Sequence, residues 1–143
     1  MSETGSWLHV RAAGMDLVLS TLDLREVVAM TPISPLPGRP PGIQGVVIYQ
    51  GEFLPVLAWE DIPGCPSSKL PPMTMAVLRP RLAIPLERMI GMIDLSTGTN
   101  QDANENDLTV TWTGGRVRMG ALDFRVLDPD RLIALLRRFR GER

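Results

Sequence analysis

The chain has 143 residues, enough for one compact domain or two small subdomains. Its 15 basic and 16 acidic residues nearly cancel, so the sequence lacks the basic surface that attracts nucleic acids or anionic membranes. It has one cysteine, no signal-peptide pattern at its start, and no apolar run near the ~20 residues that cross a bilayer. These features predict a cytoplasmic protein without an intrachain disulfide.

Short strands separated by turn residues recur along the chain. Gly and Pro number 13 each, and so many breakers suit strands joined by tight turns. In chain order, strands are predicted at Trp7–Ala12, Met15–Ser20, Glu26–Met30, Ile43–Tyr49, Phe53–Ala58, Met73–Leu78, Leu82–Pro85, Met89–Leu95, Leu108–Trp112, Arg116–Met119 and Phe124–Leu127. Residues 61–72 and 97–107 are predicted loops. Many short strands at regular spacing indicate a barrel or a sandwich.

One helix is predicted, over residues 129–140. Asp128 can cap its first backbone N–H groups, and Pro129 suits its first position. Five apolar residues then share one face: Leu132, Ile133, Leu135, Leu136 and Phe139. The arginines at its end favour the negative pole of the helix dipole, which explains this basic cluster better than a nucleic-acid site does.

The sequence also contains a faint internal repeat. A shift of 65 residues places Leu17-Val18-Leu19 over Leu82-Ala83-Ile84, and a shift of 70 places Val56-Leu57 over Val126-Leu127. Two copies of one β module would produce this pattern.

Residue sets typical of enzymes are missing from the sequence. His9 is the only histidine and is expected to face solvent from a strand, while Cys65 is expected in an exposed loop without a neighbouring base. No Cys/His group has metal-ligand spacing, and no Gly-rich phosphate loop is present. We therefore expect no catalytic residue, no metal and no cofactor.

The most informative segment runs from Leu36 to Leu57. Its prolines stiffen the approach to a hairpin that turns at Gln50-Gly51. Gly45 leaves room for another backbone or a partner to come close, and Pro55 predicts an edge strand or a bulge because it removes a ladder donor. An edge strand is a natural docking place for a partner.

The Pro and Gly framework of this segment, L-P-G-x-P-x-x-I-x-G-V-V-x-x-x-G-x-x-x-P-V-L, resembles the signature of CheW-like domains. Upstream, Leu24-Arg25-Glu26-Val27 is similar to a Val-x-Glu-Ile/Val segment of that family. Downstream, residues 126–132 resemble its closing step from strand to helix. The resemblance implies a single CheW-like domain over residues 7–140.

The fold that the resemblance implies is all-β: two SH3-like five-stranded barrels packed together, with a short C-terminal helix. We expect the first barrel at about 15–72 and the second at about 73–127 plus the N-terminal strand. The implied function is a non-catalytic adaptor that joins the cytoplasmic tip of a chemoreceptor to the regulatory domain of a CheA-type histidine kinase. It would reach the membrane only through receptors and bind no nucleic acid.

The resemblance also implies two sets of partner-binding residues. The receptor groove between the barrels would contain Leu24, Glu26, Val27, Val28, Gly45, Val47, Ile48, Leu86 and Met89. A possible contact with the kinase or the array would involve Gln50, Glu52 and Pro55. Each apolar residue of the groove is also a plausible core residue.

The sequence departs from the family pattern at two places. Family members usually carry an Arg before the hairpin glycine, where this chain has Gln50, so a charge pair with Glu26 cannot form. The second departure is Leu86-Glu87-Arg88-Met89, where the family has Val-Asp-x-Val. These differences leave two alternatives open: an accessory protein that binds receptors and couples the kinase weakly, and, more distantly, an SH3-like or OB-like nucleic-acid module.

Overall fold

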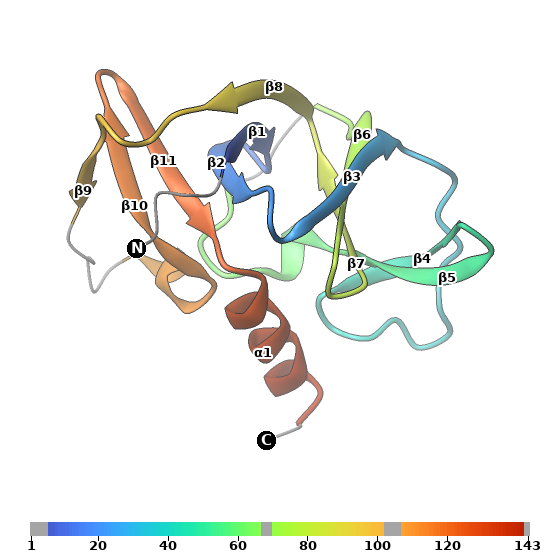
Figure 1. The fold of residues 1–143 in the computed structure, drawn as a ribbon. Coiled ribbons are helices and arrows are strands. Elements are labelled where there is room, and N and C mark those ends of the chain that lie inside the picture. Colours follow the sequence, from blue (N-terminus) through green and yellow to red (C-terminus); the bar gives the residue numbers. More distant parts are fainter. Residues whose placement is uncertain (1–5, 67–69, 102–106, 142–143) are drawn as a thin grey trace.

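The computed structural model describes residues 6–66, 70–101 and 107–141. They form two β-sheets and a C-terminal α-helix, so the mostly-β class predicted from the sequence is confirmed (Figure 1). The elements are β1 (Trp7–Ala12), β2 (Met15–Ser20), β3 (Leu24–Ala29), β4 (Ile43–Tyr49), β5 (Glu52–Leu57), the 3-10 helix η1 (Trp59–Asp61), β6 (Thr74–Leu78), β7 (Leu82–Leu86), β8 (Arg88–Ile93), β9 (Thr99–Gln101), the 3-10 helix η2 (Leu108–Thr111), β10 (Thr113–Met119), β11 (Leu122–Leu127) and α1 (Pro129–Phe139). Within the described ranges, no helix has both the length and the apolar character needed to span a membrane.

Backbone hydrogen bonds join the strands into two open sheets. One has six strands in the order β8-β1-β2-β11-β10-β9, and the other has five in the order β3-β6-β7-β5-β4. Each combines antiparallel neighbours with a parallel pair, β2 with β11 and β5 with β7. In the described part of the chain, no strand pairing joins the two end strands of either sheet. Backbone pairing therefore does not close the two barrels that the resemblance implied.

The division of the strands between the sheets differs from the expected boundaries at 15–72 and 73–127. Strand β2 pairs with β1 and β11 in the six-stranded sheet, although residues 15–20 were assigned to the first unit. Strands β6 and β7 join the five-stranded sheet, although they were assigned to the second unit. The five-stranded sheet is thus formed by β3 to β7, and strands from both ends of the chain form the other.

The internal repeat of the sequence corresponds to a repeated arrangement of strands. In each sheet a central hairpin, β1–β2 or β6–β7, lies between a single strand, β8 or β3, and a second hairpin, β11–β10 or β5–β4. Both second hairpins carry a bulge at the same place, between Thr113 and Gly115 and between Ile43 and Gly45. The central hairpins are exchanged, because each completes the sheet that is otherwise built from the other half of the chain.

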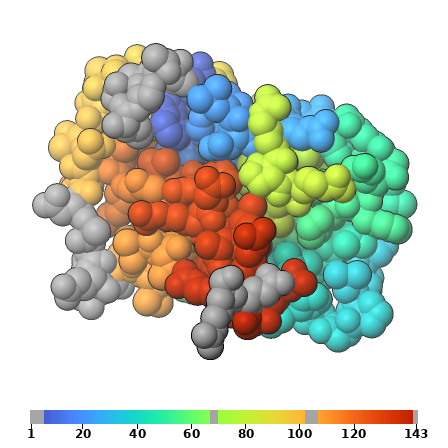
Figure 2. Space-filling model, turned by 60° about the horizontal axis from the view of Figure 1, so that its bottom comes forward, coloured from blue at the N-terminus to red at the C-terminus, as the bar shows by residue number. Residues whose placement is uncertain are grey.

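The largest apolar cluster contains residues from both sheets and from α1. Leu17 of β2, Leu86 of β7 and Leu132 of α1 are all completely buried in it. Figure 1 shows α1 below the sheets, between the six-stranded one on the left and the five-stranded one on the right. Figure 2 looks at this face and shows α1 lying across its middle. Gly42 suits the close approach of α1, because its φ of +85° favours glycine and a Cβ atom there would clash with the side chain of Leu136.

Two tryptophans of this cluster, Trp112 and the adjoining Trp59, contact each other between the two sheets. The indole N–H of Trp59 in η1 donates to the carbonyl of Pro85 in β7, at 2.8 Å. The indole N–H of Trp112, just after η2, donates to the carbonyl of Pro63 in the connection that follows η1, at 2.9 Å. The two rings contact each other with their centroids 5.6 Å apart. Buried polar groups at this junction are therefore paired as burial requires.

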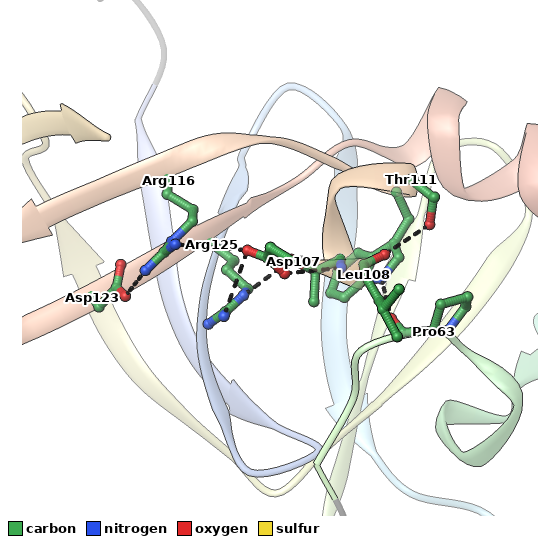
Figure 3. A network of polar contacts seen from close by, with 9 residues as sticks. Pro63, Asp107, Leu108, Thr111, Arg116, Asp123 and Arg125 are labelled. Carbon is green, nitrogen blue, oxygen red and sulfur yellow. Dashed lines mark hydrogen bonds and ion pairs between the residues drawn. The ribbon is translucent and has the colours of Figure 1, made fainter. Parts of the chain in front are cut away.

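A polar network holds η2 against the hairpin β10–β11 (Figure 3). The carboxylate of Asp107 accepts hydrogen bonds from the backbone N–H and the hydroxyl of Thr109, at 3.0 and 2.6 Å. The same carboxylate lies 3.7 Å from the guanidinium groups of both Arg116 and Arg125. Arg116 also pairs with Asp123. The network fixes the residues that lead into Trp112 and so supports the junction between the sheets.

Two predictions of local structure were wrong. Residues 108–112 were predicted as a strand, but Leu108–Thr111 form η2, because Asp107 caps the backbone of Thr109. His9 was expected to face solvent, yet only 7% of it is exposed. Strand β1 is covered on both sides, and His9 contacts Asp16 at 2.9 Å and packs edge-on against Phe124.

Further differences concern loops and edges. Strand β9 lies inside the predicted loop 97–107, of which residues 102–106 fall outside the described ranges, as do residues 67–69 of the other predicted loop. Strand β5 is not an edge strand, because β4 and β7 flank it. The pairing of β5 with β7 joins Val56 to Ala83, so the missing N–H of Pro55 breaks no pair on that side.

Candidate partner-binding surfaces

Strand β3 is one candidate surface, because it is an end strand of the five-stranded sheet and carries four predicted receptor residues. A bulge between Leu24 and Glu26 inserts Arg25 as an extra residue, so the side chains of Arg25 and Glu26 are both exposed. Leu24, Val27 and Val28 are half-buried and pack partly against the apolar clusters. A partner on β3 would therefore meet a charged pair beside partly covered apolar side chains.

Strand β8 takes the equivalent place at the end of the other sheet. Its exposed apolar residues include Met89, which was predicted, and Ile90 and Met92, which were not. Leu86, also predicted for the groove, is completely buried in the core. A partner cannot touch its side chain in this conformation, because all of β7 is buried and Leu86 packs in the largest apolar cluster.

Backbone hydrogen bonds of Met73 continue the β3-β6-β7 ladder to the end of β7, directly before β8 begins. The N–H of Met30, next to β3, donates to the carbonyl of Met73, and the N–H of Met73 donates to the carbonyl of Leu86, both at 3.1 Å. Met73 itself is exposed. We use the term β3–β8 surface for the exposed side chains of these two strands together with Met73. Three exposed methionines on it, Met73, Met89 and Met92, make it adaptable, since methionine is flexible and polarizable.

Two other residues predicted for the groove, Val47 and Gly45, are buried inside the protein and are not available to a partner. Val47 is 1% exposed and belongs to the core cluster of the five-stranded sheet. Gly45 does permit a close approach, but the approaching backbone is that of Ser34 in the same chain. A Cβ atom on Gly45 would lie 2.4 Å from the carbonyl oxygen of Ser34.

The hairpin β4–β5 forms a second candidate surface. Ile48 and Phe53 lie opposite each other in the ladder and are 67% and 69% exposed. Half-buried Val46 and Pro55 form the next pair on the same face. Ile48 thus lies beside the predicted kinase contacts and not in the β3–β8 surface. We call these four residues the hairpin face. Phe53 was missed, because the run Phe53-Leu54 gives no alternation that identifies the outward residue.

The turn of this hairpin carries the other two predicted kinase residues. Gln50 and Gly51 both have positive φ angles, of 49° and 79°, as a tight type I′ turn requires. Glu52 pairs with Arg81 at 2.8 Å across the end of the sheet. Exposed ion pairs of this kind contribute little stability, so Glu52 and Arg81 can exchange partners at small cost.

A hydrogen bond between β4 and β3 replaces the charge pair that the sequence lacks. The hydroxyl of Tyr49 donates to the carboxylate of Glu26, and the guanidinium of Arg25 lies 5.8 Å above the Tyr49 ring. The hydrogen bond to Glu26 raises the pKa of Tyr49 above its ordinary value, with smaller contributions from burial and the negative charge of Glu26, while Arg25 opposes the rise. No local sequence pattern predicts this contact, because the two residues are 23 positions apart in the chain.

A cavity of about 410 Å³ lies apart from both surfaces. Its walls include Ala13, Leu57, Trp59, Cys65 and Glu87, and none of the predicted site residues lines it. Burial raises the pKa of the Cys65 thiol to about 12, although the charge of Arg125 opposes the rise. The thiol therefore stays protonated near neutral pH, which is the state unsuited to nucleophilic attack.

Comparisons with known proteins agree with this arrangement of a two-sheet binding scaffold. The family model described as CheW-like domain matches residues 6–137. A similar solved structure is the scaffolding protein TtCheW from Thermoanaerobacter tengcongensis, with a TM-score of 0.74 and 13% identity, covering 90% of this chain and 86% of that chain. No curated protein sequence matches the chain.

The fold and its two exposed surfaces define a β-scaffold for binding other proteins. More particularly, the chain belongs to the CheW-like domain family, because the family model covers nearly all of it. Members of this family are chemotaxis scaffolds and adaptors and not enzymes.

Proposed function

We propose that this chain is a cytoplasmic adaptor of a chemosensory array, which joins the cytoplasmic tip of a chemoreceptor to the regulatory domain of a CheA-type histidine kinase. The single observation that carries the proposal is the presence of two separate exposed apolar surfaces in a CheW-like domain: the β3–β8 surface and the hairpin face. An adaptor needs two such surfaces, since it must hold both partners at once. The proposal requires no cofactor and no nucleic acid.

The receptor contact is assigned to the β3–β8 surface. Its residues come from one end strand of each sheet, and each end strand has a side without a strand neighbour in the described residues. We propose that Leu24, Glu26, Val27, Val28 and Met89 take part there, with Met73, Ile90 and Met92 added. Val47 and Leu86 lie in the core and Gly45 packs against Ser34, so none of the three touches the receptor.

The kinase contact is assigned to the hairpin face. Ile48 and Phe53 expose most of their side chains to solvent, and aromatic residues of this kind often dominate the energy of protein interfaces. Gln50, Glu52 and Pro55 border or join this face. In this view the five-stranded sheet and its connections act as one SH3-like unit, and the kinase binds its outer hairpin.

The second candidate is an accessory adaptor that binds receptors and couples the kinase weakly. Gln50 favours it, because the neutral side chain contacts Arg25 at 3.5 Å and cannot form the charge pair typical of the family. The two candidates differ only in the strength of the kinase contact.

Binding of the full chain to a purified receptor tip and to a purified kinase regulatory domain tests the proposal. Calorimetry with each partner alone, and then with the second added to the complex, measures both affinities and simultaneous binding. The bridging adaptor binds both partners together. Strong receptor binding with weak kinase binding selects the accessory adaptor, and binding of neither partner refutes both candidates.

A further inference from the structure

The two end strands of the five-stranded sheet, β3 and β4, are connected by side chains. Tyr49 of β4 donates its hydroxyl hydrogen to Oε1 of Glu26 on β3. Arg25 lies over the Tyr49 ring and reaches Oε1 of Gln50 at 3.5 Å. The sheet is thus curved enough for its opposite ends to meet, although no backbone ladder closes it in the described residues.

Tyr49 is held firmly enough to orient other side chains. It lies next to the tight turn at Gln50 and Gly51, and its ring packs against the core cluster that contains Val47 and Leu54. Glu26 and Arg25, by contrast, are exposed on a bulged end strand. Without a partner, such long side chains would sample several rotamers and would lose that freedom on binding.

We infer that Tyr49 is a positioning residue that fixes Glu26 and Arg25 side by side on β3 and thereby determines which receptor tips this adaptor accepts. The inference rests on the proposed function, since it assigns β3 to the receptor contact. Tyr49 acts through Glu26 and Arg25 and does not itself have to touch the receptor.

The hydrogen-bonding groups that Glu26 and Arg25 leave available indicate what a matching partner must present. Oε2 of Glu26 makes no recorded hydrogen bond within the described ranges and can accept one from a partner. Among the described residues, Arg25 contacts only the Tyr49 ring and Gln50, so it has further N–H donors to offer a partner. A matching receptor tip presents a cation or a hydrogen-bond donor opposite Glu26 and a carboxylate or another acceptor opposite Arg25.

The contact itself can be tested without any receptor, because Tyr49 is the only tyrosine of the chain. Ultraviolet absorbance of tyrosinate during a pH titration therefore reports Tyr49 alone. We expect the titration midpoint to fall in Glu26→Gln relative to the wild type, in line with the raised pKa of Tyr49. An equal midpoint in both proteins overturns the inference. If the protein unfolds first, the ¹³Cζ chemical shift of Tyr49 at neutral pH replaces the titration, and an identical shift in the two proteins has the same meaning.

Measurements of receptor affinity test whether the Tyr49 hydroxyl influences receptor binding through Glu26 and Arg25. Tyr49→Phe keeps the ring under Arg25 and removes only the hydroxyl, so we expect a loss of receptor affinity of about three- to tenfold, the size of one hydrogen bond. When Glu26→Gln is already present, adding Tyr49→Phe should cause no further loss of receptor affinity. Arg81→Gln is the matched control, since Arg81 borders the same small pocket as Arg25 and Tyr49, and its loss breaks the ion pair with Glu52 but leaves the Tyr49–Glu26 hydrogen bond in place.

The possible outcomes distinguish the positioning role of Tyr49 from the proposed receptor-binding function. If Glu26→Gln weakens receptor binding and Tyr49→Phe does not, the positioning role is refuted while the receptor surface stands. If Arg81→Gln weakens binding as much as Tyr49→Phe, the effect is a general loosening of the hairpin and the inference is refuted. If the wild type binds no receptor tip, the proposed function fails, and the specificity role falls with it even when the titration shows the hydrogen bond.

Discussion

The indole N–H of Trp112 donates a 2.9 Å hydrogen bond to the carbonyl of Pro63 and so ties the six-stranded sheet to the connection that follows the five-stranded one. Trp112 is completely buried and in contact with Trp59, which makes a second bond of the same kind to Pro85. The Trp59 bond stays within the five-stranded sheet and its connection, so the relative position of the two sheets depends on the bond from Trp112 to Pro63 and on the contact between the two rings, as well as on apolar packing. An adaptor that holds two partners in fixed geometry benefits from such a rigid junction.

Trp112→Phe should destabilise the fold. The substitution leaves the partly buried carbonyl of Pro63 without its donor, which costs about 1–3 kcal/mol of the free energy of unfolding, and it removes ring volume from a completely buried site as well. Urea unfolding followed by circular dichroism measures the change. Trp7→Phe is the control, because Trp7 is only half-buried and its indole makes no recorded bond in the described residues. Equal effects of the two substitutions would show that the bond to Pro63 is unimportant.

Asp107→Asn should make the free energy of unfolding change less with pH in the acid range. Burial alone would raise the pKa of Asp107, but hydrogen bonds from Thr109 and the charges of Arg125 and Arg116 together lower it below its ordinary value. A lowered pKa in the folded state contributes stability above the unfolded value, near pH 4, that is lost as the pH falls through the folded value. The difference in unfolding free energy between wild type and variant, about 1 kcal/mol at neutral pH, should thus shrink toward low pH. A difference independent of pH would contradict this assignment.

Asp128→Ala should weaken the attachment of α1. Asp128 accepts hydrogen bonds from the backbone N–H groups of Asp130 and Arg131, at 3.1 and 3.2 Å. Loss of such a cap costs about 1 kcal/mol. Thermal unfolding should show a lower midpoint for Asp128→Ala than for Asp130→Ala, whose exposed side chain caps nothing. Identical midpoints would mean that the cap does not limit the stability of the fold.

Met89→Asp and Phe53→Asp should separate the two partner contacts. Each removes one exposed apolar side chain, whose burial in an interface is worth about 1.5–3 kcal/mol, or roughly ten- to a hundredfold in affinity. We expect Met89→Asp to weaken receptor binding alone and Phe53→Asp to weaken kinase binding alone, as measured by calorimetry. Exchanged effects would reverse the two assignments.

Substitutions at Leu24 or Val28 are less clean tests of the receptor contact, although the resemblance points to both residues. Their half-buried side chains pack against the apolar clusters, so Val28→Asp and Leu24→Asp should lower both stability and receptor affinity. Affinity is therefore compared only after circular dichroism has confirmed folding. A folded variant with unchanged receptor affinity would remove that residue from the contact.

Local structure could be predicted from the sequence more fully than the sites could. Alternation and turn residues identified most strands, and the cap at Asp128 together with the apolar stripe identified α1. The membership of β2 in the six-stranded sheet was not predictable, because partners such as Leu17 and Arg125 are distant in the sequence. In the run Val46-Val47-Ile48, every residue is apolar, so no alternation showed that Val47 is buried and Ile48 exposed.

The exchange of the central hairpins makes the two halves of the chain depend on each other. Without β6–β7, strand β3 would lose its only neighbour in the five-stranded sheet and be separated from β5 and β4; without β1–β2, strand β8 would be separated from β11 in the same way. Neither sheet of the described chain can therefore be completed by its own half, and separate expression of the halves should yield two incomplete sheets with unpaired strand edges.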